Sequence, residues 1–166
     1  MAAGNTYVAI ASQTLASAAA TVTFSSIPAT YTDLVLVVQS KDTTGGEYPY
    51  IQFNGDTASN YSQTILHGNG SSAGSSRYSS ATYIYTSWMS FNTANGQITR
   101  TNIMNYANTT TNKTVLIRAD AAGSGTEATV GLWRSTAAIN SIAIKSENAA
   151  TYAIGSTFAL YGILAA

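Results

Sequence analysis

The sequence predicts an all-β domain, and three observations carry that prediction. Short apolar or alternating segments recur along the whole chain, about every ten to fifteen residues. The residues between them are mainly Ser, Thr, Asn and Gly, which favour turns and strands, whereas the charged residues that coat an amphipathic helix are scarce. Turn sequences such as Asn54-Gly55 follow the apolar segments directly. About ten short strands at this spacing are typical of a β-sandwich or a β-barrel.

The expected strands follow one another in chain order. They contain residues 7–11, 22–24, 34–38, 50–53, 64–66, 83–85, 101–106, 115–117, 130–133, 142–144 and 158–163. The segment 34–38 is continuously apolar, which predicts a strand that is buried on both faces. Leu36 and Trp133 are expected in the hydrophobic core.

The connecting segments carry residues that favour turns. Asn54-Gly55 predicts a tight turn, and residues 68–80, which are rich in Gly and Ser, predict the most flexible loop. Ile27-Pro28 lies between two expected strands, where the missing N–H of proline ends strand pairing. The chain of 166 residues has no internal repeat and no linker, so we expect one domain. Residues 1–20 form its N-terminal strand or arm and residues 21–166 its body.

The composition excludes several kinds of chemistry and partner. The chain has no cysteine, which excludes disulfides, thiolate metal sites and cysteine nucleophiles. Seven basic and seven acidic side chains give a net charge of zero, so no nucleic-acid partner is expected. No apolar run reaches the roughly eighteen residues of a membrane span, and residues 1–20 lack the basic residues of a secretion signal. Only 8% of the residues are charged, which favours association and a role inside an assembly.

Local patterns that resemble catalytic or metal-binding motifs have simpler explanations. Residues 70–74 read G-x-S-x-G, the pattern of a hydrolase nucleophile, but no helix is expected after them, and we interpret them as a loop. The single histidine, His67, cannot form a zinc site alone, and a surface or subunit-contact position is expected. Asn54, Asp56 and Asn60 carry oxygen atoms that suit calcium, yet Asx turns explain the same residues.

These patterns predict no catalytic residue, no cofactor and no metal site, so the chain is not expected to be an enzyme. A pair of carboxylates that meets only in space stays open, because sequence spacing does not reveal such a pair.

Tyrosine is abundant, with eleven residues, and it is enriched where protein surfaces meet because its ring is apolar and its hydroxyl polar. Aromatic residues gather in the middle third of the chain. Two interpretations stay open: a face that contacts another subunit or a sugar, and strand residues at the edge of the core. The candidate partner-contact residues are Tyr7, Ile10, Tyr48, Tyr50, Arg77, Tyr78, Tyr83, Tyr85 and Trp88.

Several structural motifs follow one another from about residue 21 to the C-terminus. They are residues 26–34 (SIPATYTDL), 51–56 (IQFNGD) with 59–62 (SNYS), 103–106 (IMNY), 133–139 (WRSTAAI) and 155–163 (GSTFALYGI). In this combination the chain resembles the small jelly-roll virion proteins of tailed bacteriophages. The resemblance implies an antiparallel two-sheet jelly-roll β-sandwich over residues 21–166, which in this family is often a trimer.

The resemblance also implies a place on the virion, because members serve as capsid decoration (cement) proteins or as tail-fibre tips. The chain is short, begins with methionine and has no fibrous shaft, which favours a decoration protein. Such a protein binds the major capsid protein on the outer surface of the shell, stabilises the shell and forms a homotrimer. Residues 1–20 are expected to contact the capsid or a neighbour, by adding a strand to a sheet edge. The alternative is a tail-associated receptor- or carbohydrate-binding module that uses the aromatic residues and the loop 68–80.

Overall fold

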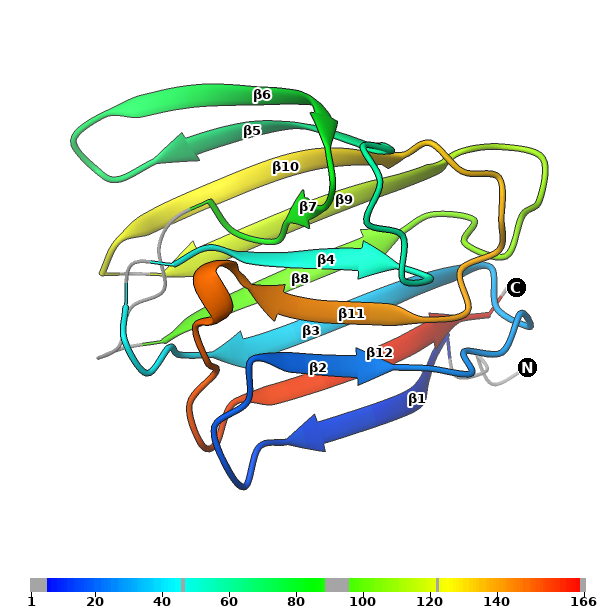
Figure 1. Cartoon of the computed structure of the whole chain (residues 1–166), viewed down its shortest axis with the longest axis horizontal. Helices are drawn as coiled ribbons and strands as arrows, with labels where there is room; N and C mark the ends of the chain where they lie inside the picture. The colour runs from blue at the N-terminus through cyan, green and yellow to red at the C-terminus, as the bar shows by residue number, and fades with distance from the viewer. Residues whose placement is uncertain (1–5, 46, 89–95, 122, 165–166) are drawn as a thin grey trace.

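The computed structural model is an antiparallel β-sandwich of two unequal sheets (Figure 1). It describes residues 6–45, 47–88, 96–121 and 123–164. The strands of these residues are β1 (Tyr7–Thr14), β2 (Thr21–Phe24), β3 (Asp33–Ser40), β4 (Pro49–Phe53), β5 (Tyr61–Gly68), β6 (Ala73–Ala81), β7 (Ile84–Tyr85), β8 (Gln97–Ile103), β9 (Lys113–Ala121), β10 (Gly125–Trp133), β11 (Ile142–Ser146) and β12 (Thr157–Ile163). The all-β, two-sheet sandwich that the sequence and the resemblance predict is confirmed.

The large sheet has eight strands in the order β1-β12-β3-β8-β9-β10-β5-β6, and the small sheet has four in the order β2-β11-β4-β7. The chain crosses between the sheets from β1 through β5, which is the strand exchange of a jelly roll. The hairpin β9–β10 widens the large sheet between β8 and β5, and β12 and β1 extend it beyond β3. The large sheet therefore presents a broad outer face. The described part of the chain contains no helix with the length and apolar character of a membrane-spanning segment.

The hydrophobic core lies between the sheets, because alternate side chains of each strand point inward. Leu34 and Leu36 of β3 and Ile51 and Phe53 of β4 are fully buried. Trp133, the last residue of β10, is buried with them. The core positions predicted for Leu36 and Trp133 are thus confirmed.

Most expected segments coincide with strands, but two expectations are wrong. The Gly- and Ser-rich segment 68–80, expected as a flexible loop, contains a short turn and most of β6, which pairs with β5 along its length. The small polar residues of this segment form an edge strand because the backbone of β5 supplies their hydrogen-bonding partners. This pairing outweighs the strand preference of the residues themselves. The strand expected at 101–106 runs from Gln97 to Ile103. Asn105 then has a positive φ of 49°, which belongs to a turn.

A hydrogen-bonded corner joins the β4–β5 turn to the loop between β10 and β11. Asn54 and Gly55 both have positive φ (52° and 69°), as the predicted two-residue turn requires. The Asn54 amide donates to the carbonyl of Ala138 (2.8 Å). Its oxygen accepts from the backbone N–H groups of Asn140 (2.9 Å) and Ser141 (3.1 Å). The corner fixes where the chain returns to the small sheet.

Asp56 completes this corner. Its carboxylate accepts from the backbone N–H of Ala58 (2.9 Å), the side chain of Asn60 (2.9 Å) and the indole N–H of Trp133 (2.7 Å). The bond to Ala58 is an Asx turn, as predicted for this segment. Segments 51–56 and 59–62 therefore contact segment 133–139 as structural elements.

The N-terminal strand is part of the large sheet rather than a separate arm. β1 pairs with β12, and the pairing is interrupted by a bulge between Ala9 and Ala11. β1 and β6 are the two edges of the large sheet. A bulge on an edge strand limits unspecific pairing with other chains.

Candidate functional site

Aromatic residues that the sequence singled out meet around β7. We call this group the aromatic cluster; it consists of Tyr48, Tyr50, Tyr78, Tyr83, Tyr85 and Trp88. The rings of Tyr50 and Tyr83 stack with their centroids 4.2 Å apart. The Trp88 ring lies nearly parallel to that of Tyr48 at 6.1 Å, and 5.1 Å from the ring of His67. Residues that are close in the middle third of the sequence are therefore also close in space.

Two glutamates organise the aromatic cluster. Glu147 accepts hydrogen bonds from the hydroxyls of Tyr83 (2.5 Å) and Tyr85 (2.6 Å). Burial, together with the bond to Glu147, raises the pKa of Tyr83 to about 12 and raises the pKa of Tyr85 as well, so both hydroxyls stay protonated at neutral pH. Glu127 is buried and accepts from the backbone N–H of Trp88 (2.7 Å). Nothing in the sequence pattern marks either glutamate as part of a site, although the alternation along β10 places Glu127 on the inner face.

Side chains in and beside the aromatic cluster bond to one another. The indole N–H of Trp88 donates to the Tyr78 hydroxyl (2.8 Å). The buried Gln63 accepts from the backbone N–H of Tyr85 (2.7 Å), while its Nε2 has no partner among the described residues. Gln63 lines a cavity of about 200 Å³ together with Tyr78, Tyr83 and Tyr85. The sugar-contact interpretation thus stays open beside the edge-of-core interpretation.

The other candidate contact residues lie elsewhere. Tyr7 on β1 and Arg77 on β6 are exposed, and the strand register places both on the outer face of the large sheet, at opposite edges. Ile10 is half-buried and packs against the core. The structure therefore brings together the six candidate residues of the aromatic cluster, while Tyr7, Ile10 and Arg77 lie apart from it.

The outer face of the large sheet carries large apolar side chains that remain exposed. Leu66 on β5, Ile98 on β8, Leu116 on β9 and Val130 on β10 are 47–61% exposed. Val130 lies directly opposite Leu116 in the strand register. Inward neighbours on the same strands, such as Ile117, are buried. We call the exposed side chains of β5, β8, β9 and β10 the outer face. The sequence places Leu66, Leu116 and Val130 in expected strands, whereas Ile98 lies outside them.

The outer face also carries positive charge. The chain has four arginines, Arg77, Arg100, Arg118 and Arg134, which lie on the outer face or at its rim. Arg100 and Arg118 stand directly opposite each other on β8 and β9, where like charges repel. Arg100 donates to the Tyr7 hydroxyl (2.7 Å), and Arg118 pairs with Asp120 (3.0 Å). An acidic and apolar surface would complement this face.

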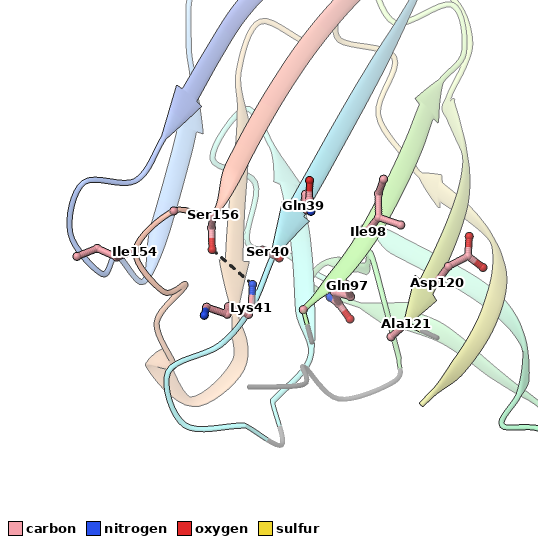
Figure 2. A pocket seen from close by; sticks show the side chains of 11 residues that line it. Gln39, Ser40, Lys41, Gln97, Ile98, Asp120, Ala121, Ile154 and Ser156 are labelled. Atoms are coloured by element: carbon pink, nitrogen blue, oxygen red, sulfur yellow. Dashed lines mark hydrogen bonds between the residues drawn. The ribbon is translucent and has the colours of Figure 1, made fainter. Parts of the chain in front are cut away.

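A cavity of about 630 Å³ opens at one end of the outer face, where β3 and β9 end and β8 begins (Figure 2). We call it the strand-end cavity. Figure 2 shows its lining spread across these strands, with Ile98 and Asp120 on one side and the loop residue Ile154 on the other. The backbone N–H of Lys41 donates to the Ser156 hydroxyl (3.4 Å) between them. Ile98 belongs to both surfaces, so the outer face continues into the cavity.

Gln97, the first residue of β8, lines the strand-end cavity and is only 5% exposed. Neither the nitrogen nor the oxygen of its side-chain amide has a hydrogen-bond partner among the described residues. An unpaired buried polar group costs about 1–3 kcal/mol, and native proteins keep few of them. The Gln97 amide is therefore buried without a hydrogen-bond partner among the described residues, and both of its polar atoms are closed off from solvent.

The serine of the G-x-S-x-G pattern lies in a hairpin turn between β5 and β6. Asn69 Oδ1 accepts from the backbone N–H groups of Ser71 (3.0 Å) and Ser72 (2.8 Å) and from the Ser72 hydroxyl (3.2 Å). A strand follows the turn, whereas the hydrolase motif needs a helix. His67 is half-buried near the end of β5, beside Trp88. Within the described ranges no three His, Asp or Glu side chains are grouped as metal ligands.

Comparisons with known proteins leave the family open. No family model matches the chain, and no curated protein matches it. A solved structure of an alginate lyase variant in complex with an alginate tetrasaccharide is similar with a TM-score of 0.29 and 8% sequence identity, over 81% of this chain and 70% of that chain. A TM-score this low supports no inference about activity.

Proposed function

We propose that this chain is a structural protein of a phage particle, a decoration (cement) protein that binds the outer surface of the major capsid protein shell and stabilises it. The observation that carries the proposal is the outer face of the large sheet, which exposes apolar side chains on four adjacent strands. Leu116 and Val130 lie directly opposite each other on this face, and an uncovered apolar patch favours contact with another protein. Contact of this surface with a partner protein is therefore more favourable than its exposure to water.

Composition supports the same function. With 8% charged residues and a net charge of zero, copies of the chain repel each other little and can lie close together on one shell. The resemblance to jelly-roll virion proteins also supports a position on the outer surface of the shell. A protein that binds the assembled shell but not its separated subunits stabilises the shell by mass action.

The arginines define the chemistry of the shell surface that this chain would bind. Arg100 and Arg118 repel each other across β8 and β9. A carboxylate of the partner placed between the two guanidinium groups would offset this repulsion and accept charge-assisted hydrogen bonds. The partner surface is therefore apolar, with Asp or Glu side chains facing β8 and β9.

The assembly state that belongs to this proposal is a homotrimer, which rests on the family resemblance. Light scattering of the purified chain over a range of concentrations tests it. A trimer mass at all concentrations supports the proposed assembly, and a monomer mass throughout contradicts it.

A binding assay on shells that lack this protein tests the function. Val130→Asp places a charge on the outer face without touching the core, and we expect it to lower the affinity for shells by at least about tenfold, because the carboxylate must be desolvated. Thr23→Asp, on the exposed side of β2 in the small sheet, is the matched control and should bind as the wild type does. A folded Val130→Asp variant with unchanged affinity would exclude the outer face as the contact.

Gold-labelled antibody on the parent particle then tests the location. Even labelling over the head supports decoration, whereas a few copies at the tail tip contradict it.

A carbohydrate-binding module on the tail is the second candidate. The rings of Tyr78 and Tyr83, which line a cavity of about 200 Å³ and are only partly buried, favour it, because aromatic rings stack on sugars. Specific binding on a glycan array that Trp88→Ala abolishes, together with no affinity for shells, would replace the first proposal by this one.

A further inference from the structure

We infer that a cavity of about 370 Å³ between β5, β6 and β10 binds the carboxylate of an acidic side chain of the partner protein. It lies toward the β6 edge of the large sheet, apart from the arginine pair on β8 and β9 (Figure 1). We call it the arginine cavity; its lining includes Thr64, Arg77, Ser79, Val130, Leu132 and Arg134. The inference deepens the proposed function and rests on it for the identity of the partner, a shell protein, while the carboxylate chemistry rests on the cavity.

The guanidinium group of Arg134 is fixed through one nitrogen and free at the other two. Its Nη2 donates to the carbonyl oxygens of Ser59 (2.8 Å), Tyr61 (3.1 Å) and Ser79 (3.2 Å). These bonds span the place where a bulge interrupts the pairing of β5 with β6. Its Nε and Nη1 donate to no atom of the described residues. A guanidinium that is already held in place loses little entropy when a carboxylate binds to its free nitrogen atoms.

Arg77 adds a second positive charge, and no acidic side chain of the protein neutralises the two. Arg77 precedes Ser79, which Arg134 contacts, by two residues on β6. It is exposed and has no hydrogen bond to the described part of the chain. All seven acidic side chains lie in that part, where the one ion pair joins Arg118 to Asp120. The arginine cavity therefore carries uncompensated positive charge, which favours an anionic ligand.

The apolar part of the lining favours an acidic side chain over other anions. Arg77, Thr64 and Val130 lie side by side on β6, β5 and β10. Leu132 lies two residues beyond Val130, on the same face of β10. Asp and Glu carry their carboxylate on an aliphatic stem, which contacts this apolar surface while the planar carboxylate contacts a guanidinium. Inorganic phosphate has no such stem.

An acidic saccharide fits the arginine cavity less well than a protein does. Sugar sites rely on aromatic rings for stacking, and the described lining contains no aromatic ring. Val130 also belongs to the outer face, so an acidic side chain in the cavity lies inside the proposed contact with the shell.

A titration of the free chain tests the cavity without any shell. Sodium butyrate, a carboxylate with a short aliphatic stem, is added at neutral pH and constant ionic strength, with sodium chloride as the reference. The Nε–H signals of the arginines are followed by NMR, and we expect saturable shifts for Arg77 and Arg134. Arg118, which already pairs with Asp120, is the internal control and should shift less. The absence of a saturable shift at Arg77 and Arg134, or a larger response to inorganic phosphate than to butyrate, would overturn the inference.

Arg77→Gln tests the same contact on shells, because Arg77 is exposed and no hydrogen bond within the described residues depends on it. We expect the affinity for shells to fall by about tenfold. Arg77→Lys keeps the charge without the planar donor group and should lower the affinity less. Lys145→Gln is the matched control on the small sheet, where Lys145 Nζ donates to Gln52 (3.0 Å); it removes the same charge and should bind as the wild type does. Equal affinities of Arg77→Gln and the wild type would contradict the inference.

A crosslink identifies the acidic residue of the partner. A photo-crosslinking amino acid at position 79, at the rim of the arginine cavity, should attach to a segment of the shell protein that contains Asp or Glu. Replacing that residue by Asn or Gln should lower the affinity of the wild type but hardly that of Arg77→Gln, since the two changes remove one contact. A crosslinked segment without an acidic residue, or an equal loss in both backgrounds, would rule the contact out.

The two proposals can fail separately. If the wild-type chain does not bind shells, the proposed function fails by itself, and the butyrate titration decides the inference alone. Saturable shifts of Arg77 and Arg134 then keep the carboxylate site without the decoration function.

Discussion

Asp56 holds two loops of the sandwich together through one carboxylate. It accepts hydrogen bonds from Asn60 and Ala58 on its own side of the corner and from Trp133 on the other. Burial opposes ionisation, but these hydrogen bonds more than offset it and hold the pKa of Asp56 below its ordinary value. The charged carboxylate is therefore the form that the fold prefers.

This pKa shift predicts how stability depends on pH. Because the folded pKa lies below the unfolded value of about 3.9, Asp56 stabilises the fold above that pH, and the contribution is lost as the pH falls through the folded pKa. Asp56→Asn removes the titration. The difference in unfolding free energy between the wild type and this variant should shrink as the pH falls from 7 to about 2. Urea unfolding at several pH values measures it, and a constant difference would contradict the assignment.

Trp133 is the largest side chain of the same corner, and it is buried against Phe53 and Tyr61. Trp133→Ala should lower the free energy of unfolding by about 3–5 kcal/mol, because it leaves a large cavity and an unpaired Asp56 acceptor. Trp133→Phe keeps most of the ring and should cost less. A loss below about 1 kcal/mol for Trp133→Ala, measured by urea unfolding, would mean that this end of β10 faces solvent or a partner.

At the scale of elements, Gly162 lets Tyr31 lie flat against β12. A methyl group at position 162 would lie 2.2 Å from Cγ of Tyr31, so the ring would have to move. Gly162→Ala should destabilise the fold by about 1–3 kcal/mol. Gly68→Ala is the control, because its methyl group would lie 3.8 Å from the nearest atom, the carbonyl of Ser72; its effect should stay within about 0.5 kcal/mol.

A double-mutant cycle isolates the contact between Gly162 and Tyr31. In a Tyr31→Ala background the ring is gone, so Gly162→Ala should cost far less than in the wild type. An equal cost in both backgrounds would mean that the methyl group disturbs the backbone of β12 instead.

Strands with strong apolar patterns could be predicted from the sequence, whereas strands defined by their partner could not. The continuous apolar pattern of residues 34–38 predicts a strand, and these residues form most of β3. β6 is made of Gly, Ser and Ala with Arg77 and Tyr78, and only its pairing with β5 makes it a strand. The same distinction between local pattern and distant partners applies to the candidate sites. The aromatic cluster is dense in sequence, while the unpaired amide of Gln97 and the contacts of Glu147 depend on residues far away in the chain.

At the scale of the whole molecule, the two sheets have different roles. The small sheet covers the core from one side, and the large sheet covers it from the other and extends beyond the edges of the small sheet (Figure 1). In the proposed function, the apolar side chains of this face would be buried against the partner and its arginines would orient the contact. Such an interface should weaken only partly in high salt, since salt screens the arginines but not the apolar contact.

The last prediction concerns the shell that this face would cover. At a free concentration one hundred times the dissociation constant, each occupied site stabilises the assembled shell by about 2.7 kcal/mol. Heating shells with increasing amounts of the chain should therefore raise their disruption temperature and keep raising it slowly with the logarithm of the concentration. Val130→Asp should shift this curve to higher concentrations, and Thr23→Asp should not. Raising the salt concentration should lower the gain without abolishing it, because the apolar contact remains; a complete loss in high salt would mean that the arginines, and not the aliphatic side chains, hold the interface.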